Sequence, residues 1–145
     1  MEIAVDGWRA SAVEWNAVRS VPASELPPLS PEQREVAKKL GVAEQDYARS
    51  ALAGERTREA LLRKTERFAR LLEHRIDALG LHAKITRVML RTTEHRFDVE
   101  IEVNGRSVPL RIEETLVDDY FDGGSIDAEE RLGRILDRAV RVVQQ

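Results

Sequence analysis

The sequence predicts an α+β fold, in which a helical N-terminal half precedes a small antiparallel sheet and two C-terminal helices. Apolar residues recur three or four positions apart over much of residues 31–79, which is the helical period, and they alternate with charged residues over 96–103, which is the period of a strand. Asn104-Gly105 then marks a tight hairpin turn, because a type I′ turn requires positive φ at both central residues. The expected order is three helices, three strands and two helices.

Composition narrows the class of protein further. The chain has 145 residues, a formal net charge of −3 and no cysteine, which excludes a disulfide scaffold, a thiolate metal site and a cysteine nucleophile. No apolar run approaches the roughly 18 residues of a membrane span, and Glu2 and Asp6 stand where a secretory leader would be apolar. We therefore expect a cytoplasmic protein without a membrane partner.

The N-terminal residues are expected to lie outside the main domain. Residues 1–19 form an arm that carries both tryptophans, Trp8 and Trp15, and residues 20–30 hold three of the five prolines, which predicts an extended linker. Residues 31–145 are then a single domain. Because tryptophan rings need to be buried, the arm either folds back on the domain or docks on a partner protein.

Capping signals and glycines divide the helical half of the domain. The first helix begins at the capping box of Ser30 and Gln33 and is expected to end at Gly41. Gly54 is interpreted as a second stop, because glycine is unfavourable inside a helix. A short second helix would end there, and a longer third helix would continue to about Leu79.

The hairpin turn fixes the register of the last two strands. Residues 96–103 and 106–112 are expected to pair so that Ile101 faces Val108 on the apolar side of the sheet. Pro109 has no N–H group and cannot donate to a further strand, so 106–112 is expected to be an edge strand.

A third strand, about residues 83–93, should precede this hairpin and complete a meander. A two-residue turn at Glu94-His95 would place Val88 opposite Ile101. Two helices follow, and their apolar residues are expected to cover one face of the sheet.

One segment resembles the helix-turn-helix of DNA-binding regulators. Residues 33–52 have Ala37 and Gly41 four positions apart, with apolar residues at the positions that this pattern requires. The resemblance implies a second helix that contacts DNA, but Glu44 and Asp46 would repel the phosphate backbone. A DNA-binding regulator is therefore the alternative function. Its candidate contacts are Gln45 and Arg49.

A second segment, residues 118–129, partly resembles an EF-hand loop. Asp118, Asp122 and Glu129 match ligand positions of that loop, which makes them candidate metal ligands. Tyr120 occupies a position where an oxygen ligand is expected, so we expect no bound metal or other cofactor. Nucleophile-elbow, Walker and dinucleotide motifs are absent from the sequence. The third interpretation is a small enzyme whose carboxylate site has no recognised motif.

The sequence thus favours a non-enzymatic protein-binding accessory or assembly subunit. It would dock a partner protein, or another copy of itself, through the N-terminal arm, with the sheet edge as a further docking site. Trp8 and Trp15 are the expected anchors, because tryptophan is enriched at the centres of interfaces. The last helix carries an arginine stripe, and its expected secondary contacts are Arg134, Arg138 and Arg141.

Overall fold

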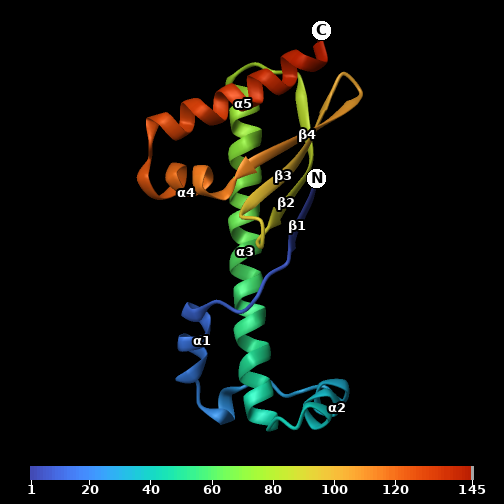
Figure 1. Cartoon of the computed structure of the whole chain (residues 1–145), viewed down its shortest axis with the longest axis vertical. Coiled ribbons are helices and arrows are strands. Elements are labelled where there is room, and N and C mark those ends of the chain that lie inside the picture. Colours follow the sequence, from blue (N-terminus) through green and yellow to red (C-terminus); the bar gives the residue numbers. More distant parts are fainter. Residues whose placement is uncertain (145) are drawn as a thin grey trace. The chain divides into compact units, whose positions relative to one another are not determined.

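The computed structural model describes residues 1–144 and has the predicted α+β class (Figure 1). The elements in chain order are β1 (Glu2–Asp6), α1 (Ala12–Arg19), a short 3₁₀ helix (Ala23–Glu25), α2 (Pro31–Leu40), α3 (Glu44–Ala78), β2 (Ala83–Arg91), β3 (Arg96–Val103), β4 (Arg106–Glu113), α4 (Glu114–Gly123) and α5 (Ile126–Gln144).

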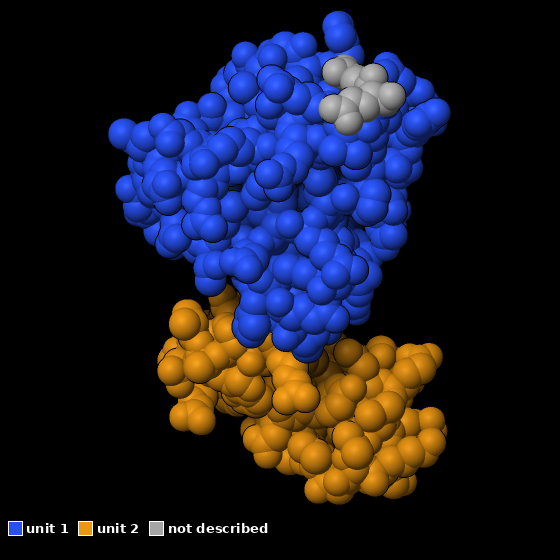
Figure 2. All heavy atoms as spheres, turned by 45° about the horizontal axis from the view of Figure 1, so that its top comes forward, with its two compact units in different colours: residues 1–7, 61–145 blue, residues 8–60 orange. Residues whose placement is uncertain are grey.

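The chain forms two compact units (Figure 2). The sheet unit consists of Met1–Gly7 and the chain from Leu61 onward, and the helical unit is Trp8–Ala60. Helix α3 contributes residues to both units. The segment expected to be an arm is therefore shared between the units, with β1 in one of them and Trp8 and α1 in the other.

The sheet has four strands in the order β1-β2-β3-β4, where a three-stranded antiparallel meander was expected. The additional strand, β1, runs parallel to β2, with Ile3 opposite Val88 and Val5 opposite Leu90. Ile3 and Val5 pack against the core of the sheet unit. The sequence of β1 has a short apolar run, Ile3 to Val5, but a parallel partner more than eighty residues away leaves no local signal of the pairing.

The hairpin of β3 and β4 has the predicted register. Ile101 lies opposite Val108, and β4 lies at one edge of the sheet, with β1 at the other. Asn104 and Gly105 have φ angles of 53° and 76°, as a type I′ turn requires.

The register between β2 and β3 differs from the expected one. Val88 lies opposite Val99 instead of Ile101, because the strands end at the pair Arg91–Arg96 and leave a four-residue turn between them. His95 supplies a positive φ of 53° in this turn. A two-residue turn was expected, and the longer loop shifts the pairing by two residues, which keeps the side chains from Arg87 to Arg91 on their predicted faces. A bulge between Ile85 and Arg87 then shifts the register by one residue, so that Ile85 is also buried in the core.

Helices α3, α4 and α5 cover one face of the sheet and form a single core with it. At its centre Phe68 of α3 packs against Phe97 of β3, with ring centroids 4.5 Å apart. The helices contribute further apolar side chains at helical spacing, among them Leu72, Val117, Leu132, Leu136 and Val140.

The prediction that Gly54 ends a helix is wrong, since α3 continues through it. A Cβ atom at this position would lie 3.3 Å from Cζ3 of Trp8, so the missing side chain makes room for the indole ring. A glycine inside a helix costs only about 1 kcal/mol relative to alanine. The expected second and third helices are therefore one helix.

Within the helical unit, side chains of α3 hold the segment that precedes α2. Thr57 Oγ1 accepts a hydrogen bond from the Ser11 N–H group at 3.0 Å. The guanidinium group of Arg49 donates to the carbonyl oxygens of Val18 and Val21, at 3.0 and 2.7 Å. Ser11 and Val18 of the predicted arm and Val21 of the predicted linker are thus held by hydrogen bonds to a helix.

Candidate functional site

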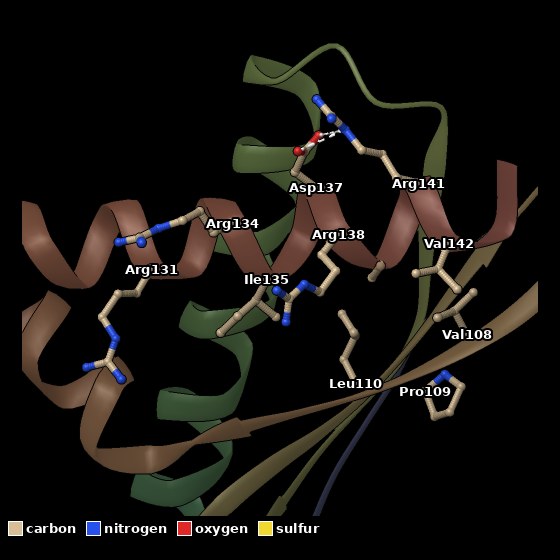
Figure 3. A pocket seen from close by; sticks show the side chains of 11 residues that line it. Val108, Pro109, Leu110, Arg131, Arg134, Ile135, Asp137, Arg138, Arg141 and Val142 are labelled. Carbon is tan, nitrogen blue, oxygen red and sulfur yellow. Dashed lines mark hydrogen bonds and ion pairs between the residues drawn. The ribbon is translucent and has the colours of Figure 1, made fainter. Parts of the chain in front are cut away.

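Two features that the sequence singled out border the same groove. The edge strand β4 and the arginine stripe of α5 enclose an open groove of about 900 Å³ (Figure 3). Both elements belong to the sheet unit. The lining residues from β4 are Val108, Pro109 and Leu110, and those from α5 include Arg131, Arg134, Ile135, Asp137, Arg138 and Val142.

The floor of the groove is apolar. Val108 and Leu110 point to the same sheet face as the buried Ile112, but at the edge strand they are only half-buried. Ile135 is half-buried and Val142 is 64% exposed. Figure 3 shows Ile135 on the side of α5 that faces β4, while Val142 lies near Val108. Ala128, Leu132, Leu136 and Val140 of α5 pack in the core, and the floor is apolar surface beside that core.

The side chains along the rim are mainly cationic. Arg131, Arg134, Arg138 and Arg141 follow one another at helical spacing, and all are exposed. Asp137 forms an ion pair with Arg141, with Oδ2 3.0 Å from Nε. Among the described residues, none of the other three arginines has an ion-pair partner. The rim therefore carries an uncompensated positive charge.

Pro109 limits how a further strand can add to this edge. It lies opposite Glu100, and in a hairpin with a two-residue turn this is a non-hydrogen-bonded pair. The main-chain groups at such a position point away from β3, so the N–H group that Pro109 lacks would face the open side. The outer edge of β4 cannot form an uninterrupted ladder.

The opposite face of the sheet carries paired charges. The guanidinium group of Arg91 bonds to Asp98, and Arg96 Nε lies 3.0 Å from Asp98 Oδ1. Arg91 Nη1 also lies 3.0 Å from Asp6 Oδ2. Burial raises the pKa of Asp98, but hydrogen bonds from Arg91 and Arg96 outweigh it and lower the pKa below its ordinary value. Asp6, Arg91, Arg96 and Asp98 thus form one network of ion pairs on this face.

The tryptophans expected to anchor a partner belong to the helical unit, and the arginines belong to the sheet unit. Trp8 packs over Gly54 and is half-buried. Trp15 lies on α1 and is also half-buried. The structure therefore does not bring the expected anchors and the expected secondary contacts together in one compact unit.

The two candidate contacts for DNA have different environments. Gln45 is exposed in the first turn of α3. Arg49 is half-buried, and its guanidinium group already donates to main-chain carbonyl oxygens.

The segment that resembles an EF-hand loop does not form that loop. Asp118 and Asp122 lie within α4, and Glu129 lies on α5, where it forms an ion pair with Arg75. Lys64 Nζ lies 2.7 Å from Asp118 Oδ1 and 2.8 Å from Oε1 of Glu114. Across residues 1–144, no three acidic or histidine side chains cluster in a way that could hold a metal ion.

Comparison with protein-family models, with curated proteins and with solved structures finds no match to this chain. None of the helices described in residues 1–144 combines the length and the apolar character needed to cross a membrane.

Proposed function

We propose that this protein is a non-enzymatic accessory subunit that binds a partner protein in the groove between β4 and α5. The observation that carries the proposal is a rim of arginines without ion-pair partners above an apolar floor, at the open edge of a sheet. When a partner covers partly exposed apolar side chains, it removes them from water, and this lowers the free energy of the complex. Arginine is among the residues enriched in protein interfaces.

The chemistry of the lining supports binding rather than catalysis. A guanidinium group stays protonated in proteins and cannot act as a general acid or base. The one carboxylate among the lining residues belongs to Asp137, which is engaged with Arg141. The groove thus offers charge and apolar contact, and its side chains include no pair arranged for proton transfer.

In this proposal the sheet edge replaces the N-terminal arm as the main docking surface. Ile3 and Val5 pack against the core, and Trp8 packs on Gly54, so these apolar side chains already have partners within the chain. The arm then contributes to the fold that presents the groove. Deleting the arm would remove strand β1 of the sheet as well as any docking site in the arm, so a loss of binding would not show where the partner docks.

Site-specific photo-crosslinking in the source cells tests this proposal. A photoreactive amino acid replaces Val142 or Arg138 in the groove, and Arg63, an exposed residue of α3, is the matched control position. We expect one protein to be crosslinked from both groove positions and not from the control. Crosslinking from all three positions, or from none, contradicts the proposal. An adduct of the chain with itself assigns the groove to self-association and also contradicts it.

A further inference from the structure

We infer that the groove takes an acidic segment of the partner, and that this segment also carries apolar side chains which cover the floor. This inference rests on the proposed function and specifies the chemistry of the occupant. It is carried by the complementarity between the uncompensated arginines and the carboxylates of such a segment.

The spacing of the arginines determines where carboxylates would fit. Arg138 lies seven positions after Arg131, with Arg134 between them, and a helix rises 1.5 Å per residue, so the row is about 10 Å long. An extended chain covers this length in about three residues. Acidic side chains two positions apart in an extended segment point to the same side and would therefore reach two of these arginines at once. A guanidinium group can bind a carboxylate through two parallel hydrogen bonds.

The apolar floor requires more than negative charge. Figure 3 shows the guanidinium group of Arg138 between Ile135 and Leu110, so charged and apolar contacts lie next to each other in the groove. A segment with acidic residues alone would leave Leu110 and Val142 in contact with water. Apolar residues between the acidic ones would cover these side chains and add hydrophobic stabilisation.

The same floor favours a peptide over a nucleic acid. A phosphate backbone would pair with the arginines, but it offers no apolar side chain for Val108 or Leu110. The net charge of the chain, −3, also opposes a general attraction to nucleic acid. Because Pro109 interrupts the outer edge of β4, we expect the segment to be held mainly through its side chains.

Selection from a random peptide library displayed on phage tests the inference. The library is selected on the full-length protein and then depleted on the variant Arg134→Gln/Arg138→Gln. We expect the remaining peptides to share acidic residues interspersed with apolar ones. Enriched peptides of neutral or basic character would overturn the inference, and so would the absence of any peptide that depends on these arginines.

Selected peptides are then synthesised with a fluorescent label, and binding is measured by anisotropy. Arg134→Gln/Arg138→Gln is expected to weaken binding about tenfold, whereas Arg63→Gln/Arg70→Gln, which removes the same charge from exposed positions of α3, leaves it unchanged. Val142→Ser removes an apolar side chain from the floor of the groove and should weaken binding several-fold. Equal losses in both arginine variants would overturn the inference, because they would reflect net charge alone.

Two further results separate the inference from the proposed function. If the photo-crosslinked partner contacts the groove through a segment without acidic residues, the inference fails and the proposed function stands. If a labelled single-stranded oligouridine binds and loses affinity in the groove variant only, the groove is a nucleic-acid site and both fail.

Discussion

Lys64 on α3 and Asp118 on α4 form an ion pair, with Nζ 2.7 Å from Oδ1. The same ammonium group lies 2.8 Å from Oε1 of Glu114, one turn earlier on α4. Burial lowers the pKa of Lys64, but hydrogen bonds to Asp118 and Glu114 outweigh it and raise the pKa above the ordinary value of 10.5. The lysine thus links two helices that cover the sheet and separates two carboxylates that would otherwise repel each other.

Replacing this lysine should destabilise the protein in a pH-dependent way. Lys64→Met is expected to lower the free energy of unfolding by about 1 kcal/mol at neutral pH. Because the folded state raises the pKa, the lysine contributes fully below 10.5 and loses its contribution as the pH rises through the higher folded value. Urea denaturation at neutral and at strongly alkaline pH measures the difference. If the wild type and Lys64→Met differ in free energy of unfolding by the same amount at both pH values, this account is contradicted.

Asp98 should show the opposite pH dependence. Asp98→Asn is expected to cost less than about 1 kcal/mol at neutral pH, because solvent screens part of its interaction with Arg91 and Arg96. Its pKa is lowered in the folded state, so its contribution is full above 3.8 and is lost as the pH falls through the lower folded value. Thermal unfolding of the two proteins should therefore converge in acid. Curves that stay equally far apart from neutral pH to strong acid would refute the assignment.

Because β1 is a strand of the sheet, a charge placed in its buried face should destabilise the protein. Val5→Asp places a charge where Val5 packs against the core, and it should lower the free energy of unfolding by about 2 kcal/mol. Val13→Asp is the matched control, because Val13 is 76% exposed on α1 and should tolerate the charge. Guanidinium denaturation compares the variants. Equal stability of the Val5 variant and the wild type would indicate a free arm.

Pro109 is expected to protect the edge strand β4 against the addition of a strand from another chain. Pro109→Ala restores an N–H group on the outer side of β4 and completes a ladder that another chain can join. We expect the variant to self-associate at lower concentration than the wild type, measured by sedimentation velocity. Ser107→Ala, on the same strand, leaves the main-chain donors unchanged and is the control. An unchanged sedimentation profile for the proline variant would mean that α5 already blocks strand addition.

Local sequence signals predicted the parts of the fold that depend on neighbouring residues. The Asn104-Gly105 turn fixed the pairing of Ile101 with Val108, because both strands leave the same tight turn. The pairing of β1 with β2 was not predicted, since it joins residues that are distant in the chain. Gly54 was misread because its reason lies in a tertiary contact with Trp8.

The candidate site was predicted only in its parts. The edge strand and the arginines of α5 were each recognised, but the floor between them was not. Val108 and Leu110 carry the signal of an apolar strand face, and nothing in the sequence shows that α5 leaves them half-covered. That information comes from the direction in which α5 crosses the sheet, which the packing of the whole core determines.

The binding affinity of the photo-crosslinked partner for groove variants tests the central claim most directly. Isothermal titration compares the wild type with Arg134→Glu/Arg138→Glu and with Arg63→Glu/Arg70→Glu, which makes the same change in charge on α3. If the groove is the docking surface, the first variant loses at least about tenfold in affinity, while the second binds as the wild type does. Equal affinities for all three proteins, with all three folded, would show that the partner binds elsewhere.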